Sequence, residues 1–140
     1  MALKQDELVQ AARAVRHRAH APFSGFLVGA AVQTADGSIF SGCNVEISSY
    51  SHTCCAERVA VFKAVSEGHK GIVACAVITD TEPPATPCGA CRQVLHDFGP
   101  DMLIILANVQ GQVRELTLKS LLPEGFTADQ VLEHIKRRHG

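Results

Sequence analysis

The stretch from His52 to Gly68, HTCCAERVAVFKAVSEG, decides the fold, because it predicts a helix between two apolar segments that have the character of strands. Its apolar side chains Val59, Phe62 and Val65 recur at helical spacing, and the glycine at its end is a common helix stop. A helix that crosses between two strands is typical of parallel strands in a sheet covered by helices. The stretch therefore predicts an α/β fold.

Outward from this helix, the same patterns predict the element order α-β-β-α-β-α-β-β-α. The expected helices cover residues 5–19, 55–67, 88–98 and a segment from about 127, and the expected strands cover residues 26–33, 38–43, 72–79, 102–107 and 112–116. Helical crossovers imply parallel neighbours in the middle of the sheet, and short turns such as Asp36-Gly37 imply antiparallel pairs at its ends. We expect a single domain over residues 1–140, with three layers α-β-α and a central mixed five-stranded sheet that carries helices on both faces.

Composition excludes several classes of function. The 140 residues carry a net charge of −1 without a long run of Lys or Arg, and they include six Phe, one Tyr and no Trp. A protein that binds a nucleic acid polymer usually has a basic stripe or a platform of stacking aromatics. No apolar stretch approaches the roughly 18 residues of a membrane span, and the N-terminus MALKQDELVQ lacks the apolar core of a secretory signal. We expect a cytoplasmic protein whose six cysteines are thiols or metal ligands rather than disulfides.

The sequence Pro87-Cys88-Gly89-Ala90-Cys91 places a C-x-x-C at the start of a predicted helix. Alone, it fits a redox pair, half of a structural zinc site or two core thiols. A structural zinc site needs a second ligand pair, and the sequence has no second C-x-x-C and no H-x-x-x-H. Cys55 opens another predicted helix, and three cysteines would leave one coordination position open, as in a catalytic zinc site.

Two charged residues beside Cys55 suit such a centre. Three thiolates would leave Zn²⁺ with a net charge near −1, which two helix N-termini, each equivalent to about +0.5 charge, partly offset. Arg58 would add to this by donating to the thiolates, although its position also suits an ordinary surface arginine. Glu57 would take a proton from a bound water and deliver it onward, or it would only complement the helix dipole.

Cys-Ala-Glu followed by Pro-Cys-x-x-Cys resembles the signature of the zinc-dependent nucleoside and nucleobase deaminases. The segments FSGFLVGAAV, GCNVE, CAER, AVSEG, PCGACRQVL and LLPEGF are similar to the small tetrameric cytidine deaminases, from about residue 7 to residue 132. The resemblance implies hydrolytic deamination of cytidine and 2′-deoxycytidine, with release of ammonia, in pyrimidine salvage. It also implies one Zn²⁺ per subunit, held by Cys55, Cys88 and Cys91, with Glu57 as the residue that moves the protons.

The resemblance extends to the substrate, a small nucleoside. Asn44 and Glu46 match positions that hold the sugar hydroxyls, and an amide and a carboxylate can exchange hydrogen bonds with a ribose. Phe26 matches a ring that packs against the base, and Phe126 matches a ring that closes the pocket of a neighbouring subunit, which implies a homotetramer. Ala56 is small enough to let the base approach, and its carbonyl could accept from the exocyclic amine.

Departures from the family pattern leave alternatives open. Ile47 stands where the family often has an asparagine, and His20 stands where a tyrosine is common. The first departure keeps open a deaminase of a modified cytosine nucleoside such as blasticidin S. A structural zinc protein without catalysis is an alternative of another class, and it would need a fourth protein ligand such as Cys54 or His52.

Three further cysteines are expected not to bind the metal. Cys54 should lie about 100° around a helix from Cys55 and face the protein, given ~3.6 residues per turn. Cys43 and Cys75 lie on predicted strands and are expected to be buried thiols.

Overall fold

The computed structural model describes residues 2–139, which fold around a five-stranded sheet with the strand order β2-β1-β3-β4-β5. The strands are β1 (Gly29–Thr34), β2 (Ile39–Cys43), β3 (Ile72–Thr79), β4 (Leu103–Asn108) and β5 (Val113–Thr117). The helices are α1 (Gln5–Arg16), α2 (Ala56–Ser66), α3 (Gly89–Phe98), α4 (Leu118–Leu121) and α5 (Ala128–His139), together with a 3₁₀ turn at Tyr50–His52. The patterns in the sequence do not predict the 3₁₀ turn or α4.

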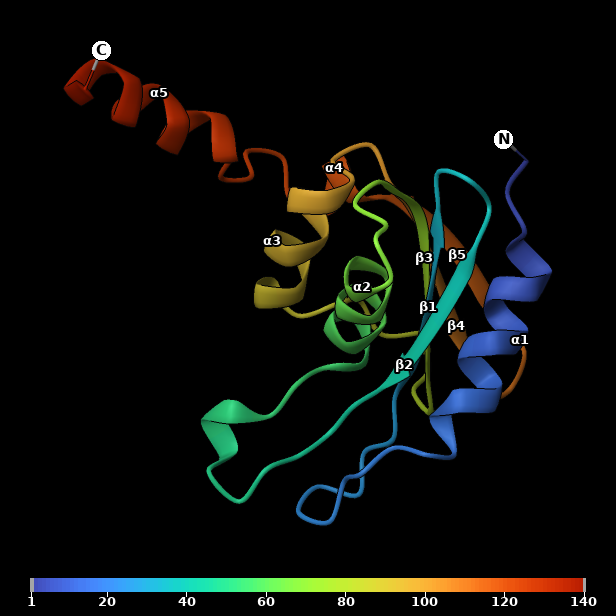
Figure 1. The fold of residues 1–140 in the computed structure, drawn as a ribbon. Helices are drawn as coiled ribbons and strands as arrows, with labels where there is room; N and C mark the ends of the chain where they lie inside the picture. The colour runs from blue at the N-terminus through green and yellow to red at the C-terminus, as the bar shows by residue number, and fades with distance from the viewer. Residues whose placement is uncertain (1, 140) are drawn as a thin grey trace.

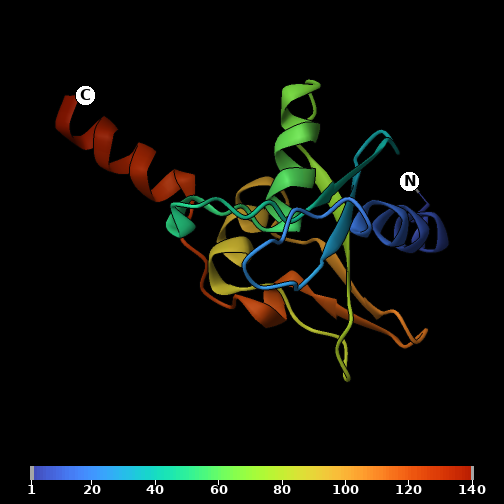
Figure 2. The same cartoon turned by 90° about the horizontal axis from the view of Figure 1, so that it is seen from below.

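Helices cover both faces of the sheet. Helix α1 lies on one face, while α2 and α3 lie on the other (Figures 1 and 2). Helix α5 stands away from the sheet (Figure 1), and none of its residues 128–139 is buried. The predicted three-layer fold with a mixed five-stranded sheet is confirmed.

The strand pairing corrects one expectation. Strands β3 and β4 are parallel, as predicted for two strands joined through α3, and the other three neighbouring pairs of this sheet are antiparallel. Helix α2 joins β2 to β3, but β1 lies between these two strands. The prediction that the strands on either side of α2 are parallel neighbours is therefore wrong. Strand β1 pairs with β3, and its hairpin partner β2 lies at the edge of the sheet.

Two connecting segments, residues 17–28 and 44–55, run side by side at one end of the sheet (Figures 1 and 2). Their pairing shifts the ends of two predicted elements. The first helix ends at Arg16, three residues early, because His20 pairs through its main chain with the second segment. The first strand begins at Gly29, three residues late, because side chains of the second segment hold the residues before it.

Each helical layer packs directly onto a glycine of the sheet. A Cβ at Gly29 would lie 2.0 Å from the carbonyl oxygen of Ala12 in α1. A Cβ at Gly42 would lie 2.5 Å from the nitrogen of Ala60 and 2.9 Å from the carbonyl oxygen of Ala56, both in α2. These contacts fix the height of α1 and α2 above the sheet, and the second fixes the first turn of α2.

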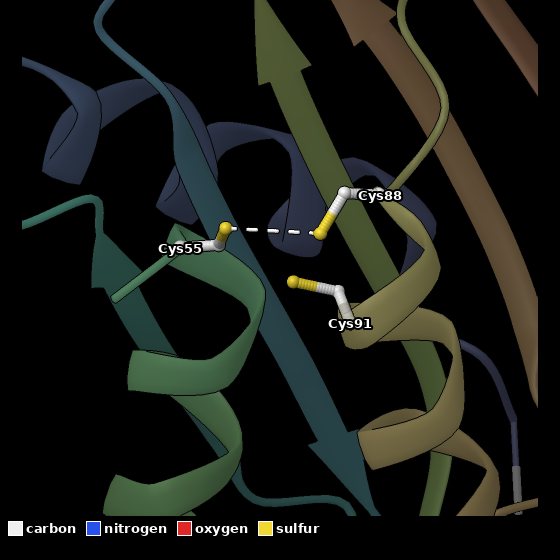
Figure 3. A group of neighbouring side chains, drawn as sticks. All are labelled: Cys55, Cys88 and Cys91. Carbon is white, nitrogen blue, oxygen red and sulfur yellow. Dashed lines mark hydrogen bonds between the residues drawn. The ribbon is translucent and has the colours of Figure 1, made fainter. Parts of the chain in front are cut away.

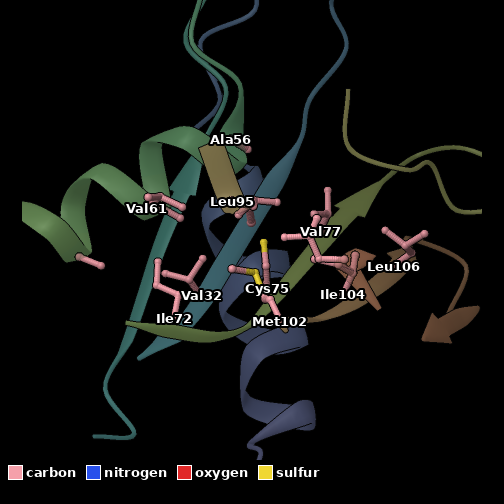
Figure 4. Close-up of a cluster of buried hydrophobic side chains, with 14 residues drawn as sticks. Val32, Ala56, Val61, Ile72, Cys75, Val77, Leu95, Met102, Ile104 and Leu106 are labelled. Atoms are coloured by element: carbon pink, nitrogen blue, oxygen red, sulfur yellow. The ribbon is translucent and has the colours of Figure 1, made fainter. Parts of the chain in front are cut away.

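The apolar core beneath α2 and α3 supports the two helices that carry the predicted ligands (Figure 4). It comprises Ala30, Val32, Ala56, Ala60, Val61, Ala64, Ile72, Cys75, Val77, Leu95, Met102, Ile104, Leu106 and Leu118. Burial of this apolar surface is the main stabilising term for such a layer, at roughly 25 cal/mol per Å². Within residues 2–139, no helix is both long enough and apolar enough to cross a membrane.

Candidate functional site

Helices α2 and α3 begin at cysteines that face each other. Cys55 and Cys88 are the N-cap residues of α2 and α3, and both have extended backbone, with φ/ψ of −70°/155° and −65°/167°. Cys91 lies in the first turn of α3. The three sulfurs lie within 4.8 Å of one another, and the sulfurs of Cys55 and Cys88 are 3.9 Å apart (Figure 3). The structure thus brings the three predicted ligands together.

This donor set fits zinc. Tetrahedral zinc with Zn–S distances of about 2.3 Å would hold its sulfurs about 3.8 Å apart, close to the 3.9 Å between the sulfurs of Cys55 and Cys88. Among residues 2–139, no fourth Cys, His, Asp or Glu joins the cluster, so Cys54 and His52 do not supply the ligand that a purely structural zinc site would need. Three protein ligands leave a coordination position open, as in catalytic sites.

The charge of Arg58 is directed at this cluster. Its Nη2 donates to the sulfur of Cys55 at 3.4 Å and to the carbonyl oxygen of Thr53 at 3.3 Å. The bond to Cys55 raises the pKa of Arg58. Its Nε is buried and finds no acceptor among the residues that the structure describes. The guanidinium is therefore held as a fixed positive charge beside the sulfurs.

The groups around the sulfur of Cys55 favour its thiolate. A hydrogen bond from Cys91, together with the bond and charge of Arg58, lowers the pKa of Cys55. The same bond to Cys55, with burial, raises the pKa of Cys91. A thiolate at Cys55 is the form in which sulfur binds a metal ion.

Glu57 lies in the first turn of α2 and is only 4% exposed. Burial raises the pKa of Glu57 to about 7, and the neighbouring charge of Cys55 adds to this effect. A carboxyl group with a pKa near neutral can both accept and donate a proton under ordinary conditions. Glu57 therefore has the electrostatic environment that proton transfer requires.

A cavity of about 290 Å³ opens beside the cysteines. Its wall includes the predicted residues Phe26, Asn44, Glu46, Ala56 and Glu57, together with Cys55 and Cys88. The size lies near the lower end of the roughly 300–1,000 Å³ of small-molecule sites. Residues predicted to contact the sugar, the base and the metal therefore line a single cavity.

The wall also contains residues that sequence reasoning missed, which are Ser24, Val28, Thr53, Val77, Thr79, Ala85 and Thr86. Val77 and Thr79 follow Cys75 at every second position of β3, so the alternation of a strand could have placed them on one face. Ser24 lies two residues before Phe26 in the segment FSGFLVGAAV, but the resemblance assigns it no role at the site.

Phe126 does not line this cavity. Its main-chain N–H donates to the side-chain oxygen of Gln93 at 3.1 Å, and its carbonyl oxygen accepts from the side-chain nitrogen of Gln93 at 2.7 Å. The ring is 58% exposed. Its predicted contact concerns a neighbouring subunit and stays a prediction.

The two adjacent cysteines differ for a reason other than the one expected. Neither lies inside a helix, because Cys54 pairs with Val45 through both its N–H and its carbonyl group, at 3.0 and 2.9 Å. Extended backbone at residues 54 and 55 points successive side chains in opposite directions, so the helical-rotation argument is wrong. Burial raises the pKa of Cys54, which disfavours its thiolate. Cys75 is buried as expected, whereas Cys43 is only half-buried.

The sequence and the fold of this chain are similar to those of known proteins. A family model described as "Cytidine and deoxycytidylate deaminase zinc-binding region" matches residues 3–107. The cytidine deaminase of Halalkalibacterium halodurans is 48% identical over 125 residues, which are 89% of this chain and 95% of that protein. The crystal structure of cytidine deaminase from Burkholderia pseudomallei matches with a TM-score of 0.85 at 46% identity, over 89% of this chain and 100% of that one. The blasticidin-S deaminase of Bacillus cereus is 33% identical over 108 residues, which are 71% of this chain and 76% of that protein.

Proposed function

The chain belongs to the cytidine and deoxycytidylate deaminase family, and from this membership we propose that it hydrolyses cytidine and 2′-deoxycytidine to uridine and 2′-deoxyuridine, with release of ammonia. The observation that carries the proposal is the cavity beside the three cysteines, whose wall combines the buried carboxyl of Glu57 with two buried polar side chains, Asn44 and Glu46. A buried acid beside a three-sulfur site suits a hydrolysis in which two protons are moved one after the other.

The three cysteines would supply the metal ligands for the mechanism. Cys55, Cys88 and Cys91 would hold Zn²⁺, which when bound lowers the pKa of water from about 16 toward about 7 and so supplies the nucleophile at neutral pH. Arg58 limits the negative charge of the three sulfurs through its bond to Cys55. The first turns of α2 and α3 add the partial positive charge of two helix N-termini.

Glu57 moves the protons. Its carboxylate takes the proton of the attacking water and gives it to N3 of the pyrimidine as the C4–O bond forms. The oxygen now bonded to C4 still carries one proton, which passes through Glu57 to the C4 amine. The amine leaves as ammonia when the C4–N bond breaks. A pKa of about 7 suits a group that must both accept and donate.

The remaining wall would hold the substrate. Phe26 would pack against the base, and the carbonyl of Ala56 would accept from the exocyclic amine. Asn44 and Glu46 would bind the sugar hydroxyls, and the negative charge of Glu46 would repel a phosphate, so a nucleoside is favoured over a nucleotide.

At the level of the cell, the proposed role is pyrimidine salvage in the cytoplasm. The proposed assembly is a homotetramer in which the exposed ring of Phe126 closes the cavity of a neighbouring subunit. Sedimentation of the purified protein tests the tetramer independently of activity.

The test of the activity is the loss of ultraviolet absorbance when the enzyme is mixed with cytidine, deoxycytidine, cytosine or blasticidin S. Turnover of the first two is expected, and turnover of blasticidin S alone would overturn the proposal in favour of the modified nucleoside. Ile47, the residue that keeps this alternative open, is 42% exposed and is not among the residues that line the cavity.

A further inference from the structure

Glu46 is tied to the first connecting segment by three hydrogen bonds. Its Oε1 accepts from the main-chain N–H of Phe23 at 3.0 Å and of Ser24 at 3.1 Å, and its Oε2 accepts from the hydroxyl of Ser24. The carboxylate is only 3% exposed. The hydroxyl of Ser24 is the main reason that the pKa of Glu46 is lowered, with the two N–H groups acting in the same direction. These bonds fix both the orientation and the charge of Glu46.

The hydroxyl of Ser24 also contacts the residue that is expected to hold the base. The main-chain N–H of Phe26 donates to Oγ of Ser24 at 3.0 Å. A hydroxyl group has one hydrogen to donate and lone pairs to accept, so Ser24 can serve Glu46 and Phe26 at the same time. It therefore links the carboxylate of Glu46 directly to the main chain of Phe26.

Asn44 holds the same segment at Phe26 and Val28. Its Nδ2 donates to the carbonyl oxygen of Phe26 at 2.8 Å, and its Oδ1 accepts from the N–H of Val28 at 2.9 Å. Both polar main-chain groups of Phe26 are thus bound, the N–H by Ser24 and the carbonyl by Asn44. The position of the ring in the cavity wall depends on these two anchors.

We propose that Ser24 is a positioning residue for substrate recognition, which holds Glu46 and Phe26 in the arrangement that grips the sugar and the base of one nucleoside together. This inference rests on the proposed function, because it assumes that a nucleoside occupies the cavity. Ser24 takes no part in the chemical step, since within residues 2–139 its hydrogen bonds lead to Glu46 and Phe26 and not to Glu57 or the cysteines.

The role predicts a separation of KM from kcat. Ordering one side chain when a ligand binds corresponds to a factor of up to about 10 in affinity, and Glu46 without the Ser24 hydroxyl would have to be ordered when the substrate binds. In Ser24→Ala, we expect KM for cytidine to rise about tenfold while kcat stays within about twofold. Ser24→Thr keeps the hydroxyl and is expected to restore most of the affinity. Ser66→Ala, which removes an exposed hydroxyl from the far end of α2, serves as the matched control and is expected to leave both constants unchanged.

A substrate analogue tests the link to the sugar. For 2′,3′-dideoxycytidine, which lacks both ring hydroxyls, the contact with Glu46 is missing in every variant. We therefore expect Ser24→Ala to raise KM for this analogue less than it raises KM for cytidine. Isothermal titration with the product uridine measures the same loss without turnover, and thermal unfolding verifies that the variant is folded.

Each outcome decides the inference. An unchanged KM in Ser24→Ala, a fall in kcat alone, or an equal KM penalty for cytidine and its dideoxy analogue would overturn it. If the wild-type protein does not convert cytidine at all, the proposed function fails instead, and the two failures remain distinct.

Discussion

The two faces of the sheet are built alike but serve different purposes. Helix α1 packs on Gly29 over an apolar cluster, and α2 packs on Gly42 over another. On the α1 face the contacts bury apolar surface together with the hydrogen-bonded side chain of Gln33. On the opposite face, α2 and α3 begin at Cys55 and Cys88, and in the described part of the chain neither side chain forms a capping hydrogen bond with its own helix. In the same part of the chain, Lys4 at the start of α1 also forms no capping bond with its helix, so the difference lies in the residue type, since the cysteines at the starts of α2 and α3 place their sulfurs close together.

The largest expected effect separates two neighbouring residues of the second face. In Cys55→Ala, we expect loss of bound zinc and of all measurable turnover, because one of three sulfur donors is removed. In Cys54→Ala, zinc content and turnover should stay near the wild-type values, because the sulfur of Cys54 is not part of the cluster. Metal analysis of the two purified variants makes the comparison, and zinc loss from Cys54→Ala would contradict it.

The second prediction compares a buried polar residue on each face. In Glu57→Gln, we expect zinc to be retained while kcat falls about 10³-fold, since general acid–base groups contribute roughly 10² to 10⁴. The outcome that contradicts the proposed role of Glu57 is a kcat within tenfold of the wild-type value.

Gln33 is the matched control on the α1 face. It is fully buried, and its side chain accepts from the N–H of Lys4 at 2.9 Å and donates to the carbonyl oxygen of Ala2 at 3.0 Å. In Gln33→Met, we expect the free energy of unfolding to fall by about 1–3 kcal/mol, because two hydrogen bonds are lost. Turnover by the folded variant should be unchanged.

The third prediction uses the glycine beneath each helix. Gly29→Ala and Gly42→Ala both force a helix away from the sheet, and each should lower the free energy of unfolding by about 1–3 kcal/mol. Only Gly42→Ala displaces the main chain of Ala56, which lies between Cys55 and Glu57. We therefore expect weaker zinc retention against a chelator, and a lower kcat, in Gly42→Ala alone. Equal zinc retention in the two variants would break the comparison between the faces.

The parts of the fold that the sequence predicts well are those with local causes. Strand β3 has the predicted bounds, Ile72–Thr79, because a continuous run of β-branched and small apolar residues suits a buried strand. The ends of α1 and β1 differ from prediction because they depend on pairing between segments more than 15 residues apart in the chain. Helix α4 has only four residues, which is too short for any periodic pattern.

The residues of the site also divide into those that local sequence predicts and those that depend on distant segments. Cys55, Cys88 and Cys91 could be predicted because metal sites demand particular side chains at characteristic spacings. The bond between Ser24 and Glu46 could not, because a serine hydroxyl and a carboxylate 22 residues apart form no recognisable pattern. Nor does spacing show that Asn44 holds main-chain groups of Phe26 and Val28 as well as lining the cavity.

The smallest expected effect lies at the turn between β1 and β2, at the end of the hairpin away from the cavity. Asp36 accepts from the hydroxyl of Thr34 at 2.5 Å and from the N–H of Ser38 at 3.1 Å, and His69 lies 3.7 Å away. The Thr34 bond, followed by those from Ser38, lowers the pKa of Asp36 from 3.8 to about 2.

Because the folded pKa lies below the unfolded one, the charge of Asp36 stabilises the fold above about pH 4, and this contribution disappears as the pH falls through about 2. Asp36→Asn removes the charge but keeps an acceptor oxygen. We expect its Tm at pH 7 to fall by no more than about 3 °C, since an exposed carboxylate is screened by solvent. The difference from wild type should shrink toward pH 2, and kcat at pH 7 should not change. A large loss of turnover in this variant would mean that the end of the hairpin away from the cavity also controls the site, and the two regions would then not be independent.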